Sequence, residues 1–170
     1  VLKIKPTQAT LVPDLPDALT SNAGWDTVKH QSFLREIISE LKRNKIRTSV
    51  FIETDLKMIE NAAKCGTDRI ELYTESYAKK FYTNKGKAIK PFVNAAKCAQ
   101  EIGLGLNAGH DLNLDNLKYF AGKIPNPRRL RASGQRTGSL RPDGQGVSCP
   151  GLSKKYTGNL KRVLKNTQGR

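Results

Sequence analysis

Four times in succession, a short apolar run of the kind that forms β-strands is followed by apolar residues at helical spacing. This repeat constrains the fold strongly, because consecutive strands joined through helices lie parallel and are connected by right-handed crossovers. The sequence therefore predicts an α/β fold. The strand-like runs occupy residues 8–13, 47–53, 69–74 and 103–109.

The helical patterns lie between and after these runs. Thr54 is the predicted N-cap of the second helix and Gly66 its stop, while Pro91 is expected in the first turn of the third helix. A long polar and aromatic connection is expected between residues 74 and 90. The predicted helices cover residues 26–44, 55–65, 90–102 and 114–121.

Polar residues gather where the predicted strands end. Asp14 follows the first strand, Glu53 closes the second, Glu71 lies within the third and His110 follows the fourth. A (β/α)8 barrel carries its chemistry at the ends of many strands, whereas a doubly wound sheet concentrates it at one switch point. Both architectures fit the repeat, and this spread favours a TIM-type (β/α)8 barrel, incomplete here with about four strand-helix units. No GxGxxG motif follows a strand and no Walker loop is present, which argues against nucleotide binding.

Positive charge is concentrated at the carboxyl end of the chain. Of the formal net charge of +15, residues 127–170 supply +10, since they hold 11 Lys/Arg and one Asp/Glu. This stretch is rich in Gly, Ser and Arg, so it cannot bury enough apolar surface to offset its ordering entropy. We predict two parts, a partial barrel over residues 1–126 and a disordered basic tail over residues 127–170.

The cysteines indicate a reducing compartment. Cys65, Cys98 and Cys149 are isolated in the sequence and form no CxxC pair, which argues against a disulfide framework and against structural zinc. The cytoplasm is therefore the expected location. No run approaches the roughly 20 apolar residues of a membrane span, and the N-terminus lacks the layout of a signal peptide.

His110 is the first candidate for chemistry. Its imidazole can exchange a proton near neutral pH, and the preceding Ala108 and Gly109 would let a substrate approach the backbone closely. The alternative is a histidine that caps the next helix or bonds a loop. Its position after a strand of the predicted barrel favours a functional role.

Two further positions are candidates. Glu71 lies between apolar neighbours in its strand, so alternation directs its carboxylate to the opposite face, which in a barrel is the interior. That carboxylate is either poised for catalysis or paired with a buried cation. Thr20 lies in a hydroxyl-rich loop with Ser21 and Asn22 before a helix, where anions are often held, although such loops also serve simply as helix caps.

Five motifs follow one another along the chain: TLVPD at 10–14, LTSNAGWD at 19–26, RTSVFIETD at 47–55, DRIELYTESYA at 68–78 and LNAGHDLN at 106–113. In this order and spacing they resemble the pyridoxine 5′-phosphate synthase family of vitamin B6 biosynthesis. The resemblance extends over about residues 5–126.

The resemblance implies an activity and site residues. A (β/α)8 barrel of this family condenses 1-deoxy-D-xylulose 5-phosphate with 3-amino-2-oxopropyl phosphate to pyridoxine 5′-phosphate, phosphate and water. No metal or organic cofactor is implied, and the family resemblance implies a homo-oligomer. His110 matches the general acid, Glu71 the transition-state-stabilising carboxylate and Thr20 a contact to the deoxyxylulose phosphate. Asp111 stands where the family usually has a glycine that contacts the aminoketone phosphate.

The sequence also departs from the family pattern. The first three strands of the family barrel, with a histidine and a glutamate that accept protons, have no counterpart upstream of Val1, and the tail replaces the last strand with its Gly-His phosphate contact. We therefore expect the fragment to be inactive and poorly soluble alone, because an incomplete barrel leaves strand edges unpaired. The alternative function is a basic protein that binds polyanions through its Arg/Lys-rich tail, in a strongly salt-dependent way.

Overall fold

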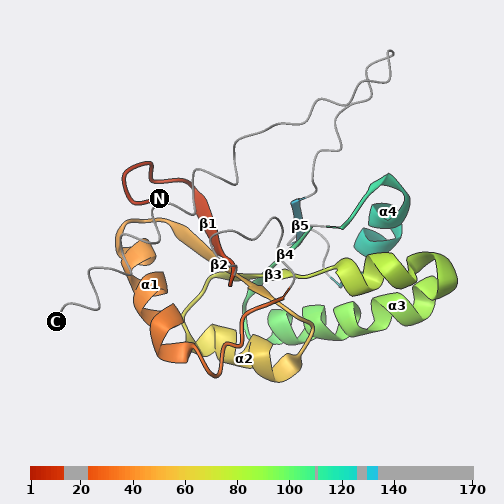
Figure 1. Cartoon of the computed structure of the whole chain (residues 1–170), viewed down its shortest axis with the longest axis horizontal. Helices are drawn as coiled ribbons and strands as arrows, with labels where there is room; N and C mark the ends of the chain where they lie inside the picture. The colour runs from red at the N-terminus through yellow and green to blue at the C-terminus, as the bar shows by residue number, and fades with distance from the viewer. Residues whose placement is uncertain (14–22, 110, 126–129, 134–170) are drawn as a thin grey trace, which may run out of the picture.

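The computed structural model describes residues 1–13, 23–109 and 111–125, together with the backbone of residues 130–133 (Figure 1). Its strands form one parallel sheet in which the spatial order follows the chain order. A doubly wound sheet would reverse that order at a switch point, whereas a barrel does not. The α/β prediction is confirmed, and the order agrees with a barrel. The strands are β1 (Gln8–Leu11), β2 (Arg47–Ile52), β3 (Arg69–Leu72), β4 (Gly105–Gly109) and β5 (Leu130–Ser133).

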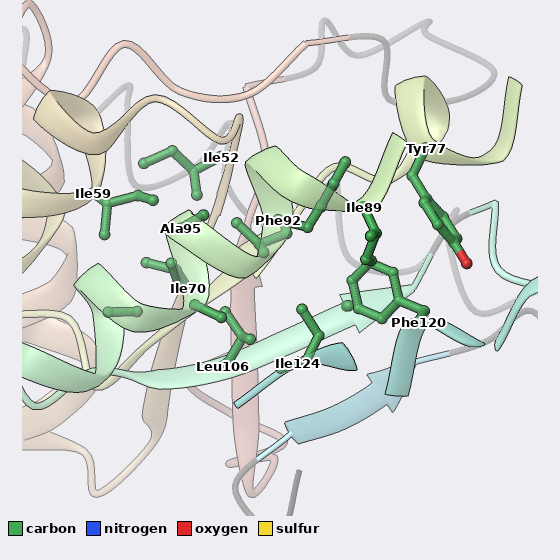
Figure 2. Close-up of a cluster of buried hydrophobic side chains, with 14 of the residues drawn as sticks. Ile52, Ile59, Ile70, Tyr77, Ile89, Phe92, Ala95, Leu106, Phe120 and Ile124 are labelled. Atoms are coloured by element: carbon green, nitrogen blue, oxygen red, sulfur yellow. The ribbon is translucent and has the colours of Figure 1, made fainter. Parts of the chain in front are cut away.

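Helices follow the first four of these strands. They are α1 (Gln31–Arg43), α2 (Leu56–Lys64), α3 (Glu75–Glu101) and α4 (Leu114–Lys123). Each helix has an apolar stripe, and alternate side chains of the strands pack against these stripes. The hydrophobic core therefore lies between the helices and one face of the sheet (Figure 2). The strands contribute Val50, Ile52, Ile70, Leu72, Leu106 and Ala108, all buried.

Local hydrogen bonds set two helix starts differently from the prediction. The Asp26 carboxylate accepts the N–H of Lys29 at 2.8 Å, which makes a turn and delays α1 until Gln31. Asp55, not Thr54, is the N-cap of α2, because its carboxylate accepts the N–H of Met58 at 3.1 Å. An aspartate at the cap also places a negative charge at the positive end of the helix.

The expected connection between residues 74 and 90 is wrong, because this stretch is helical. α3 begins at Glu75 and continues to Glu101, with a break in helical geometry at Asn84 (φ −157°, ψ 84°). Pro91 therefore lies inside the helix and not in its first turn. Tyr77 is fully buried, and its ring packs edge-on against Phe81, Phe92 and Phe120.

β5 lies within the stretch predicted to be disordered. It pairs in parallel with β4, and Gly109 is opposite Ser133 in the register. The prediction needs correction for residues 130–133, since a composition averaged over 44 residues does not report a short strand that extends an existing sheet edge. The rest of the predicted tail, residues 127–129 and 134–170, lies outside the described residues, and the boundary at residue 126 stays a prediction.

Within the described part of the chain, no helix has the length and apolar character needed to cross a membrane.

Candidate active site

The face of the sheet that does not pack on the helices is largely polar. Paired residues of parallel strands direct their side chains to the same side, and two such rows run across this face. One row is Thr10, Ser49, Arg69 and Gly105, and the other is Phe51, Glu71 and Asn107.

Glu71 takes the orientation that strand alternation predicted. Its neighbours Ile70 and Leu72 are fully buried against the helices, whereas Glu71 is half-buried on the polar face. Its Oε2 accepts a hydrogen bond from Thr10 Oγ1 at 3.1 Å. Asn107 lies directly opposite Glu71 on β4. The carboxylate is thus held on the face that a barrel would enclose.

A second polar network lies beside Glu71. Arg69 Nε donates to Asn107 Oδ1 at 2.7 Å, and Asn107 Nδ2 donates to Ser49 Oγ at 3.1 Å. The Arg69 guanidinium also donates to the Leu106 carbonyl at 2.6 Å. Gly105 makes room for it, since a Cβ there would lie 2.4 Å from Arg69 Nη1. The buried amide of Asn107 and the guanidinium of Arg69 are both held by several hydrogen bonds, so the polar side chains of this face have fixed positions.

The loop after β4 is tied to the end of β3. The buried hydroxyl of Thr74 donates to the Gly109 carbonyl and accepts the N–H of Asp111 at 3.4 Å. His110 itself lies outside the described residues. The residues on both sides of it are therefore attached to Thr74, which follows Glu71 by three positions.

Carboxylates collect at the carboxyl ends of β2, β3 and β4. Loss of water around Glu53 raises the pKa of its carboxyl; the Gly24 N–H opposes this shift and the charge of Glu75 adds to it. Burial raises the pKa of Tyr73, and the charges of Glu75, Asp111 and Glu53 raise it further. Lys79 offsets part of this charge through an ion pair with Glu75 at 2.8 Å.

Asp111, predicted to contact a phosphate, is one of these carboxylates. Together with Glu53 and Glu75 it forms what we call the acidic rim of the sheet. Its side chain is half-buried, and its charge opposes a phosphate placed directly beside it. Its backbone N–H already reaches Thr74 Oγ1. The phosphate contact of Asp111 stays a prediction, and a carboxylate that turns away from the phosphate is the arrangement that charge favours.

The loop that contains Thr20 begins and ends at the same rim. Thr20 lies outside the described residues, but β1 leads into the loop and the chain returns at Gly24 against the end of β2. The Trp25 N–H donates to the Phe51 carbonyl at 2.9 Å. A Cβ on Gly24 would lie 2.5 Å from the Glu53 nitrogen, so only glycine allows this approach.

The sequence alone does not indicate two parts of this arrangement. The helical pattern predicts a helix that begins near Lys90, whereas α3 begins at Glu75, so nothing in the sequence marks Thr74 as a residue at a helix start. The contact between Arg69 and Asn107 joins residues 38 positions apart. The one local signal for it is Asn107 itself, a polar side chain within an otherwise apolar strand.

Comparison with known proteins decides the family. A sequence model described as Pyridoxal phosphate biosynthesis protein PdxJ matches residues 1–132. The chain belongs to the PdxJ family. The predicted resemblance is confirmed. The acidic rim therefore lies at the carboxyl edge of a PdxJ sheet.

Named relatives of this PdxJ chain are bacterial proteins called pyridoxine 5′-phosphate synthase. The chain is 56% identical over 125 residues to the one from Christiangramia forsetii, covering 74% of this chain and 53% of that protein. It is 58% identical over 125 residues to the one from Cytophaga hutchinsonii, covering 74% of this chain and 52% of that protein. The chain thus spans about half the length of the curated relatives it matches.

The described residues contain no group of three or more His, Cys, Asp or Glu side chains placed to hold a metal ion. Cys65 and Cys98 are free thiols, and burial raises the pKa of both, so neither is activated as a thiolate. Cys65 belongs to a cluster of buried hydrophobic residues, and Cys98 packs against another such cluster.

Proposed function

We propose that the whole protein is a pyridoxine 5′-phosphate synthase that condenses 1-deoxy-D-xylulose 5-phosphate with 3-amino-2-oxopropyl phosphate. The products are pyridoxine 5′-phosphate, phosphate and water. Membership of the PdxJ family and the names of its relatives support this assignment. The chain described here supplies part of the active site.

The observation that carries the proposal is the pairing of β3 with β4. Glu71 lies opposite Asn107, and Asn107 precedes His110 by three positions in the sequence. The Thr74 hydroxyl forms hydrogen bonds with both residues that flank His110. A proton donor and a carboxylate on neighbouring strands of one rim suit a reaction that needs several proton transfers.

His110 acts in this proposal as the general acid. Ring closure requires loss of water and of phosphate, and an imidazolium at the rim can protonate a departing oxygen of a substrate bound over it. Glu71 stabilises positive charge that develops on the reacting atoms, because a half-buried carboxylate held by Thr10 needs no reorientation during the reaction. Thr20 contacts the deoxyxylulose phosphate from the loop between β1 and Gly24.

The test is a steady-state assay of the full-length enzyme with both phosphorylated substrates and detection of pyridoxine 5′-phosphate by mass spectrometry. His110→Asn should lower kcat by about 10² to 10⁴-fold, the usual contribution of a general acid. Glu71→Gln should lower kcat by about 10²-fold. Full activity of either variant would overturn the role assigned to that residue.

His30→Asn provides the matched control. His30 is the other histidine of the chain. It occupies the N-cap position of α1 without a side-chain capping hydrogen bond, and it packs edge-on against Trp25. Asparagine is a good N-cap residue, so this variant should fold and keep its activity. A loss of activity equal to that of His110→Asn would show that histidine replacement acts through the fold.

A homo-oligomer, the absence of a cofactor and a cytoplasmic location also follow from the resemblance or the composition and stay predictions. Sedimentation of the full-length protein measures its oligomeric state. Activity retained after exhaustive dialysis against a chelator would agree with the absence of a metal cofactor. The polyanion-binding alternative concerns the basic tail, residues 127–170, of which the structure describes only the backbone of residues 130–133, and it stays a prediction.

A further inference from the structure

Thr74 occupies a helix start but does not use its side chain there. It is the N-cap of α3, and its hydroxyl makes no capping hydrogen bond to the first turn of that helix. Threonine at this position usually accepts an N–H of the first turn and so stabilises the helix. The side chain of Thr74 is instead engaged elsewhere, which calls for a physical reason.

The hydroxyl joins two peptide groups of another loop. Thr74 Oγ1 donates to the carbonyl of Gly109 and accepts the N–H of Asp111 at 3.4 Å. One hydroxyl thus acts as donor and as acceptor to the residues on either side of position 110. Thr74 is fully buried and Gly109 is also buried, so the hydrogen bond between them is shielded from solvent.

We propose that Thr74 is a positioning residue, whose hydroxyl holds the peptide groups of Gly109 and Asp111 and so restrains the backbone that carries His110. The inference rests on the proposed function, in which His110 is the general acid. A general acid must lie within hydrogen-bond reach of the proton acceptor, and a displacement of about 1 Å can cost about 10²-fold in rate. Two hydrogen bonds from a buried side chain restrict such displacement.

The same residue also couples the two predicted catalytic strands. Thr74 follows Glu71 by three positions, so any shift of the end of β3 is transmitted to the loop after β4 through the hydroxyl. The acidic rim makes this restraint useful. Asp111, Glu53 and Glu75 all contribute negative charge around Tyr73, and the Thr74 hydrogen bonds hold the loop that carries Asp111 against this like-charge repulsion.

The test compares Thr74→Val with Thr74→Ser in the full-length enzyme. Valine keeps the shape and removes the hydroxyl, whereas serine keeps the hydroxyl and loses a methyl group. Thr74→Val should lower kcat by about 10 to 100-fold with the KM of both substrates within about two-fold of wild type. Thr74→Ser should restore kcat to within about three-fold. Equal losses in the two variants, or a valine variant with wild-type kcat, would overturn the proposal.

Histidine NMR supplies a readout that does not depend on turnover. The Cε1–Hε1 cross-peak of His110, identified by its disappearance in His110→Asn, should move in Thr74→Val and return toward its wild-type position in Thr74→Ser. The His30 cross-peak should stay in place in both. An unchanged His110 cross-peak in a folded Thr74→Val protein would contradict the positioning role.

The two proposals fail in different ways. If His110→Asn keeps full activity, the proposed role of His110 is wrong whatever Thr74 does. If His110→Asn is inactive while Thr74→Val retains wild-type kcat, the general acid stands and only the positioning role of Thr74 is wrong.

Discussion

Thr10 Oγ1 on β1 donates to Glu71 Oε2 on β3 at 3.1 Å, although β2 lies between the two strands. Neighbouring strands are about 4.8 Å apart, so side chains on β1 and β3 start roughly 10 Å apart. For them to meet, both side chains must reach over β2 from the same face, and we infer from the contact that the sheet is concave on that face. The contact agrees with the curvature of a barrel.

Removing the Thr10 hydroxyl should loosen the Glu71 carboxylate. Hydrogen bonds to charged groups contribute about 1.5–3 kcal/mol, and partial exposure of Glu71 reduces this, so Thr10→Val should lower kcat/KM roughly ten-fold. Thr10→Ser retains the donor and should remain near wild type. Steady-state kinetics of the full-length enzyme measures both, and indistinguishable values for valine and wild type would refute the restraint.

The buried hydroxyl of Tyr77 should contribute to stability. It donates to the Asn116 carbonyl at 2.7 Å, and burial raises the pKa of Tyr77 to about 12, so it stays a donor at all ordinary pH values. Tyr77→Phe removes this buried hydrogen bond and should cost about 1 kcal/mol of unfolding free energy in urea titrations.

Tyr82→Phe is the matched control for that substitution. Tyr82 also donates to a carboxylate, Asp115, at 3.0 Å, but it is 72% exposed. Water replaces the lost partner of an exposed group, so the change should stay within about 0.5 kcal/mol. Equal losses from the two substitutions would show that burial does not control the contribution.

Asp68 should make the fold sensitive to acid. Burial raises the pKa of this carboxyl, but hydrogen bonds from Thr48 and the nearby Lys42 ammonium outweigh that effect and lower it below the ordinary value. A carboxyl with a lowered folded-state pKa stabilises the fold above its unfolded pKa of about 4, and this contribution is lost as the pH falls through the folded value.

The unfolding free energy, measured in urea from pH 7 to pH 3, should therefore fall on the acid side. Asp68→Asn should be less stable than wild type at pH 7 by about 1–2 kcal/mol, and its stability should fall less steeply below pH 4. Parallel pH curves for the two proteins would exclude Asp68 as a source of the acid sensitivity.

Gly24 should tolerate no side chain. A Cβ would lie 2.5 Å from the Glu53 nitrogen and 2.6 Å from Ile52 Cα, and both are backbone atoms that cannot move aside alone. Gly24→Ala should displace the backbone at the end of the loop that contains Thr20 and lower the melting temperature by several degrees. Under the proposed function it should also raise the KM for deoxyxylulose phosphate.

Gly122→Ala is the control for Gly24→Ala. Gly122 lies in α4, and nothing lies within 4 Å of the position that its Cβ would occupy. Alanine has the higher helix propensity, so the variant should be as stable as wild type or more stable by up to about 1 kcal/mol. If Gly122→Ala lowered the melting temperature while Gly24→Ala left it unchanged, the expected difference between the two glycines would be wrong.

The sequence by itself determined the α/β class, the four strand-helix units, the direction of Glu71 and the family. These properties depend on local periodicity and on short motifs, which are readable along the chain. The tertiary structure decided the contacts of Thr10 with Glu71, of Arg69 with Asn107 and of Thr74 with the loop after β4, which join residues 61, 38 and 35 to 37 positions apart. It also decided the pairing of β5 and the burial of Tyr77. Such contacts depend on strand register and on the curvature of the whole sheet, and no local pattern encodes either.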